Sequence, residues 1–193
     1  FGTISGYGQL GGALAEYDVK TDKIETYTNV IANQSVATLH YNNKGVIYGG
    51  TTIFGGLGAK PKEKEAKVFL WDVNNKKLIK EFVPVKNAMA ITCLVDGPDE
   101  EIWGFADGII FVIDANTGKT LRTKTLFKVE ENPTHIWRIG FLQLHPNGLM
   151  YGRNKFDYAI DRLKLGYRHI IFWICKNGIF YWKLKDPEKQ KDQ

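Results

Sequence analysis

The residues best suited to chemistry are His135, Trp137 and Arg138, which lie within four positions of one another in the segment PTHIWR. A tryptophan ring offers a flat platform, and an arginine guanidinium binds a carboxylate through two parallel hydrogen bonds. This combination favours a site for sugar rings or uronate carboxylates. A structural role also fits, in which Trp137 packs in the interior and Arg138 pairs with an acidic side chain.

A second group of residues offers uncharged hydrogen-bonding groups and one apolar ring. As ligand-binding candidates beside His135, Trp137 and Arg138 we take Asn33, Gln34, Thr51, Thr52 and Phe54. Other histidines fit structural roles, and His40 is interpreted as a satisfied core residue. Asp107 stands in an Asp-Gly turn, where a turn role is the default.

Residues 51–66 (TTIFGGLGAKPKEKEA) form the one long connection in the sequence pattern. Long loops in compact domains are often functional. We expect its glycines to make this insertion mobile and Ile53, Phe54 and Leu57 to give it an apolar tip. A surface loop without a binding role is the alternative.

A catalytic use of the first cluster remains open. His135 would act as a general base and Arg138 would neutralise a carboxylate, with a divalent ion assisting, as in a polyuronate lyase or lactone hydrolase. The sequence contains no HExxH, paired CxxC, GxSxG, P-loop or EF-hand pattern. We therefore assign no metal and no cofactor, and we favour a non-catalytic binding module over a carbohydrate-active enzyme.

Two short landmarks recur along the chain and predict an internal repeat. The first is an aromatic residue followed by glycine, at Tyr7-Gly8, Tyr48-Gly49, Trp103-Gly104 and Tyr151-Gly152. The second is an apolar residue followed by aspartate, at Tyr17-Asp18, Trp71-Asp72, Ile113-Asp114 and Ile160-Asp161. A period of about 41 to 48 residues, with the insertion removed, is typical of a four-stranded propeller blade.

Short apolar runs without helical periodicity predict strands throughout. Innermost strands are expected at 36–41, 89–95 and 141–144. The landmarks predict complete blades at 36–82, 88–125 and 137–166, a half-blade at 170–182, and two outer strands of an earlier blade at 12–17 and 23–27. We therefore predict an all-β protein whose residues 1–185 form an incomplete set of about four antiparallel blades of a larger propeller, followed by a polar tail at 186–193.

Composition narrows the class of partner. Hydrophobic residues make up 44% of the chain and aromatic residues 13%, which fits a globular protein of packed blades. The net charge of +5 is too small for the dense basic stripe of a nucleic-acid binder, and no apolar run reaches the ~18 residues of a membrane span. Two cysteines argue against a disulfide scaffold, and Cys93 is expected to be a buried thiol.

The segments GQLGGALAEYDVKTDK, IWGFADGIIFVIDANTGK and LQLHPNGLMYG resemble YVTN/WD40-like (quinoprotein-like) β-propellers, and more narrowly the propeller modules of large secreted proteins of Gram-positive bacteria. The resemblance implies further blades or neighbouring domains as partners and an extracellular or cell-surface location. It leaves the ligand open between a polysaccharide and a partner protein.

The resemblance also raises the question of a quinone cofactor, whose docking motif in related propellers has the form A-x-D-x-x-T-G-K-x-x-W. Asp114, Thr117, Gly118 and Lys119 match that motif. Its alanine and tryptophan positions hold Val112 and Arg122, so both apolar packing points are lost. We expect no quinone cofactor.

Overall fold

The computed structural model describes residues 1–97, 100–125, 140–144, 150–156, 168–175 and 178–183, with side-chain environments for 1–97, 100–125 and 142–143. Its strands form four antiparallel sheets. The first sheet holds β1 (Ala13–Asp18) and β2 (Lys23–Thr28), and the second holds β3 (Ser35–Tyr41), β4 (Val46–Thr52), β5 (Val68–Asp72) and β6 (Lys77–Phe82). The third holds β7 (Ile91–Asp96), β8 (Glu101–Ala106), β9 (Ile109–Asp114) and β10 (Thr120–Thr125), and the fourth holds β11 (Gly140–Leu144), β12 (Met150–Phe156), β13 (Arg168–Cys175) and β14 (Gly178–Lys183).

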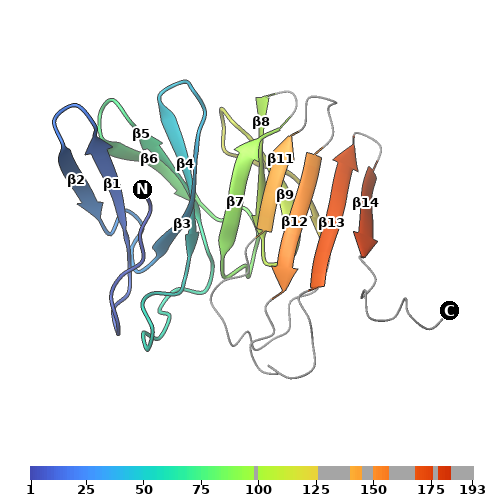
Figure 1. Cartoon of the computed structure of the whole chain (residues 1–193), viewed down its shortest axis with the longest axis horizontal. Coiled ribbons are helices and arrows are strands. Elements are labelled where there is room, and N and C mark those ends of the chain that lie inside the picture. The colour runs from blue at the N-terminus through green and yellow to red at the C-terminus, as the bar shows by residue number, and fades with distance from the viewer. Residues whose placement is uncertain (98–99, 126–139, 145–149, 157–167, 176–177, 184–193) are drawn as a thin grey trace.

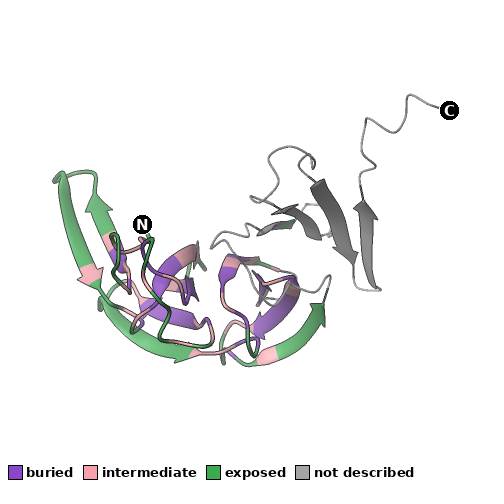
Figure 2. Cartoon of the chain, turned by 90° about the horizontal axis from the view of Figure 1, so that it is seen from below, coloured by how far each residue is buried: buried purple, intermediate pink, exposed green. Residues whose placement is uncertain are grey.

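The sheets are arranged as blades around a common axis. In each four-stranded sheet the strands pair in chain order, and the first strands lie beside one another, β3 against β7 and β7 against β11. Figure 1 shows the sheets following one another in chain order, and Figure 2 shows the first three placed along a curve. The outermost strands β2, β6 and β10 are mostly exposed. This is the radial plan of a propeller, and the predicted fold class is confirmed.

The core lies between neighbouring sheets. Four successive residues of β5, from Val68 to Trp71, are buried, and so are four of β9, from Ile110 to Ile113. Because successive side chains of a strand point to opposite faces, this continuous burial means that both faces of each sheet are covered. In the first sheet, Tyr27 packs against Trp71 of the second with ring centroids 4.8 Å apart.

The aromatic-Gly landmark has a packing cause. Gly49 is paired across the strands with Phe69, and Gly104 with Phe111. In both pairs the phenyl ring lies over the glycine, so a Cβ atom would stand 2.0 Å from the ring of Phe69 or 2.1 Å from that of Phe111. Only glycine leaves room for the ring of the facing strand.

The fourth sheet corrects the predicted blade boundaries. Residues 170–182 are not a half-blade of their own, because β13 and β14 are the third and fourth strands of the sheet that begins with β11. Gly152 pairs with Phe172, which repeats the Gly–Phe register of the two preceding sheets. Cys175 therefore occupies the position at which Asp72 and Asp114 stand. Ile160 and Asp161, the predicted landmark, lie outside the described residues.

The first copy of the repeat also begins earlier than predicted. Tyr7-Gly8 does not end a strand: it forms a turn, with Tyr7 83% exposed and Gly8 at a φ of +71°. The chain segment paired with β1 is instead residues 1–3, because Gly2 bridges Leu14 and the N–H of Thr3 donates to the Ala13 carbonyl at 2.9 Å. Residues 4–12 are thus the first sheet's counterpart of the insertion.

Three aspartates fix the turns that lead to the outermost strands. Each carboxylate of Asp18, Asp72 and Asp114 accepts backbone N–H groups two and three residues later, at 2.6–3.4 Å. These hydrogen bonds favour the ionised form, so the pKa of each aspartate lies below its usual value. The largest causes are the Lys20 N–H, the Asn75 side chain and the Thr117 N–H, respectively.

Replacing all three residues in an Asp18→Asn/Asp72→Asn/Asp114→Asn variant is expected to flatten the acid limb of the stability profile. A carboxylate with a lowered folded pKa stabilises the fold above its unfolded pKa of about 3.9, and that stabilisation is lost as the pH falls towards the folded pKa. Melting temperatures measured between about pH 6 and pH 3 should converge for parent and variant at the acid end. Parallel curves would contradict a role for these carboxylates.

Candidate functional site

The candidate site lies on the loop face, which we define as residues 29–34, 53–67 and 83–90. The insertion runs from β4 to β5 and is held on both sides. On one side Gln34 Nε2 donates to the Glu65 carbonyl at 2.9 Å. On the other side the N–H of Ile53 donates to the Met89 carbonyl at 3.0 Å, and that of Ala66 to the Ala88 carbonyl at 2.7 Å. Loops of the second and third sheets are thereby joined into one surface.

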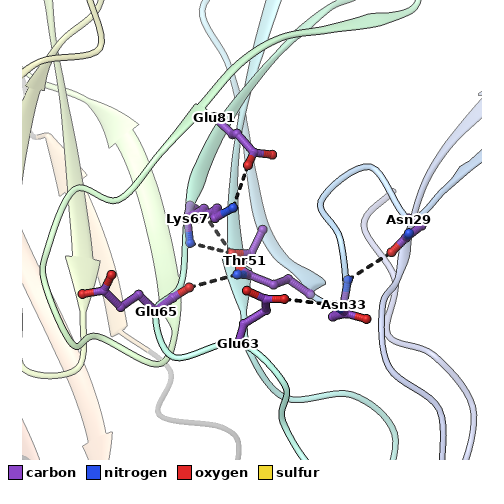
Figure 3. Close-up of polar contacts among 8 residues, drawn as sticks. Asn29, Asn33, Thr51, Glu63, Glu65, Lys67 and Glu81 are labelled. Carbon is purple, nitrogen blue, oxygen red and sulfur yellow. Dashed lines mark hydrogen bonds and ion pairs between the residues drawn. The ribbon is translucent and has the colours of Figure 1, made fainter.

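A buried hydroxyl anchors the insertion to β4. Thr51 is fully buried, and its Oγ1 accepts the Lys67 N–H at 2.8 Å. The same hydroxyl is positioned to donate to Gln34 Oε1 or, at 3.0 Å, to the Lys67 carbonyl. Gln34 is only 1% exposed, so its amide is committed to the protein at both ends. Figure 3 shows this contact set.

The two glutamates of the insertion also turn towards the protein. Glu63 Oε1 accepts a hydrogen bond from Asn33 Nδ2 at 2.9 Å. Glu65 Oε1 accepts the Asn87 N–H at 2.8 Å. At the start of β5, Lys67 Nζ forms an ion pair with Glu81 at 2.6 Å. These contacts tie residues 60–67, the part of the insertion that returns to β5 and is here called the limb, to both flanking loops.

Gly55 and Gly56 of the insertion allow close packing, a role that the sequence interpretation did not assign to them. Gly55 and Gly56 are buried, and the N–H of Gly56 donates to the Gln9 carbonyl at 3.0 Å. A Cβ atom would lie 2.2 Å from the Gln9 oxygen at position 55 and 1.9 Å from the Gly6 oxygen at position 56. The backbone of residues 4–12 therefore lies directly on the insertion.

The predicted ligand-binding residues divide by exposure. Gln34, Thr51 and Thr52 lie close together, but they are buried at 0–1% exposure and bonded within the protein. Asn33 and Phe54 are partly exposed on the same face. The other three candidates lie outside the described residues: His135, Trp137 and Arg138.

The exposed lysines of this face were missed by the sequence interpretation. Lys60, Lys62 and Lys64 are exposed, whereas the intervening Glu63 and the following Glu65 are partly buried. The alternation of lysine and glutamate in KEKE was the available signal, because a segment with one covered side places successive side chains alternately in and out. At the tip, Leu57 is 71% exposed and stands beside Tyr7, since the Gly8 N–H donates to the Leu57 carbonyl at 2.8 Å.

Other reactive side chains lie away from the loop face. His40 Nε2 contacts Asp96 Oδ1 at 2.8 Å. This contact joins the C-terminal ends of β3 and β7, whereas the loop face lies at their N-terminal ends. Cys93 is a buried free thiol, as predicted, and burial raises its pKa.

Among the described residues no group of three or more His, Cys, Asp or Glu side chains is arranged to hold a metal ion. The described part of the chain also has no helix of the length and apolarity that a membrane span requires.

Comparison with protein-family models and with curated proteins finds no match. Among solved structures, the chain is similar to the β-propeller domain of Cps50 (Swd1) from Myceliophteria thermophila, with 10% identity and a TM-score of 0.37 over 96% of this chain and 85% of that one. It is also similar to the computationally designed Ika8 protein, with 14% identity and a TM-score of 0.33 over 95% of this chain and 58% of that one. The chain's own sheet order and its adjacent inner strands define it as a β-propeller arc.

Proposed function

We propose that the chain is a non-catalytic binding or scaffold module whose ligand, a polysaccharide or a partner protein, is held on the loop face. The observation that supports this most is the set of buried hydrogen bonds around Thr51 and Gln34. They fix loops of adjacent sheets into one preformed surface. A preformed surface binds without a large ordering cost, which is how rigid scaffolds present recognition loops.

The same proposal retains His135, Trp137 and Arg138 as ligand contacts beside the partly exposed Asn33 and Phe54. It also includes the extracellular or cell-surface location and the further blades that the family resemblance implies. In the sequence, His135, Trp137 and Arg138 come shortly before β11, the first strand of the fourth sheet. In a propeller, loops at that position share a face with those preceding β3 and β7.

The polysaccharide form of the proposal is tested with a glycan array that includes polyuronates. His135→Ala and Arg138→Ala should each weaken binding about tenfold, because a lost charge-assisted contact is worth about 1.4 kcal/mol. Lys124→Ala, at an exposed position of β10, is the matched control and should bind as the parent does.

The outcome also separates binding from catalysis. Incubation with polygalacturonate should yield no unsaturated product, with or without a chelator. Product formation that His135→Ala abolishes would replace the binding module by a lyase. An array without any bound glycan would exclude the polysaccharide form and leave a protein ligand.

A further inference from the structure

The insertion presents unpaired positive charge on a fixed backbone. Within the described residues, ion pairs hold Lys44, Lys67 and Lys76, each to a glutamate. By contrast, the side chains of four exposed lysines on the loop face have no hydrogen-bond or ion-pair partner among the described residues. These four lysines, here called the basic rim, are Lys60, Lys62, Lys64 and Lys86.

The carboxylates that could neutralise the basic rim are committed elsewhere. Glu63 and Glu65 are the only acidic residues of the insertion, and their hydrogen bonds to Asn33 and Asn87 direct them towards the protein. Lys86 directly precedes Asn87, so the contact with Glu65 brings it to the same limb as Lys64. The covered side of the limb is therefore acidic and the open side is basic.

The limb is also held in one conformation. Pro61 restricts the backbone between Lys60 and Lys62, and the hydrogen bonds from Gln34 and Ala66 fix the following residues. Lysine binds as a compact point charge without the planar geometry of arginine. A row of such charges on a fixed backbone suits a run of carboxylates, for which the spacing of charges is the main requirement.

Two exposed apolar side chains lie at the tip of the insertion that carries Lys60, Lys62 and Lys64. Leu57 and Tyr7 are 71% and 83% exposed and are neighbours at the tip of the insertion. Figure 1 shows the N-terminal loop and the insertion extending from the same side of the sheets. A leucine side chain offers a sugar no hydrogen bond, but it offers a peptide an apolar contact. This favours a peptide over a charged polysaccharide as the ligand of the rim.

We propose that the basic rim, together with Tyr7 and Leu57, is the docking surface for an acidic peptide segment of a partner protein that carries apolar side chains among its carboxylates. This rests on the proposed binding function and assigns its ligand a chemical class. The juxtaposition that carries it is a row of unpaired lysines beside two exposed apolar side chains on a limb anchored by buried hydrogen bonds.

Fluorescence anisotropy with a fluorescein-labelled (Glu-Glu-Leu)4 peptide provides the test. The parent should bind this peptide, and Lys60→Glu/Lys62→Glu/Lys64→Glu should weaken binding by at least about tenfold, because charge reversal turns complementary contacts into repulsive ones. The control Lys20→Glu/Lys23→Glu/Lys77→Glu changes the same net charge at exposed lysines near the outer strands and should stay within about twofold of the parent.

The apolar component is tested separately. Tyr7→Ala/Leu57→Ala should weaken binding of (Glu-Glu-Leu)4 but leave that of (Glu-Glu-Gly)4 unchanged. Circular dichroism and melting temperatures establish that each variant is folded.

Three results would overturn the proposal: no binding of the acidic peptide to the parent, equal losses in the rim and control variants, or tighter binding of oligogalacturonate than of the peptide. The first result, together with a neutral glycan that binds the loop face, would leave the proposed binding function intact. If no ligand binds the loop face, both the acidic-peptide proposal and the proposed binding function are contradicted.

Discussion

Replacing Gly104 with alanine is expected to lower the free energy of unfolding by about 3 kcal/mol, at the upper end of what overpacking usually costs. The new Cβ atom would stand 2.1 Å from the ring of Phe111, which is fully buried. The sign of this change is informative, because replacing a strand glycine with alanine otherwise raises the free energy of unfolding by about 0.5–1 kcal/mol. Urea-induced unfolding measures the difference.

Two comparisons isolate the ring contact as the cause. Gly6→Ala is the control, since no atom lies within 4 Å of a Cβ there, and its effect should stay within about 0.5 kcal/mol. In a double-mutant cycle, Phe111→Leu should recover part of the loss caused by Gly104→Ala. Additive effects of the two substitutions would show that the ring and the glycine are not coupled.

Thr51→Val is expected to destabilise the fold by about 2–3 kcal/mol, because it leaves the buried Gln34 Oε1 and the partly buried Lys67 N–H without their partner. Valine keeps the shape and the strand preference of threonine, so the loss reports the hydroxyl alone. Protease nicking within the insertion should also become faster, since this hydroxyl anchors the limb to β4. Denaturant titration and timed digestion provide the two measurements.

The neighbouring residue supplies the control for this substitution. Thr52 is 1% exposed, and its hydroxyl makes two longer contacts of 3.3 Å, to the Met89 carbonyl and the Phe54 N–H. Thr52→Val should therefore cost less, about 1 kcal/mol. Equal losses at the two positions would contradict the central role of Thr51.

Blades could be predicted from the sequence where the aromatic-Gly pattern reflects a glycine packed under a phenylalanine ring. The pairs Tyr48-Gly49 and Trp103-Gly104 marked true second strands, because each glycine accommodates a phenylalanine of the facing strand. Tyr7-Gly8 satisfied the same residue pattern without that partner and was wrong. Phe172 precedes Cys175 by three residues, as Phe69 and Phe111 precede Asp72 and Asp114, so the fourth sheet keeps the phenylalanine but not the aspartate on which the sequence prediction relied.

The candidate site could be predicted in outline only. A propeller places sequence-distant loops side by side, so the proximity of Gln34, Thr51 and the insertion followed from the fold. Their burial did not follow, because Thr51 and Thr52 are consecutive and an exposed strand end would show only one of them to the interior. The insertion covers one side and the third sheet covers the other, and the path of a long loop depends on tertiary contacts that no local pattern encodes.

Among the described strands, the principal contacts between sheets join each sheet to the next: β1 with β3, β3 and β4 with β7, and β7 and β8 with β11. Such a chain is nearly one-dimensional in its energetics, with each unit coupled to its nearest neighbours. Duplication or deletion of one whole sheet would then alter a pair of interfaces and leave the rest untouched. Gene rearrangement can change the number of blades in this way without redesigning the interfaces between the others.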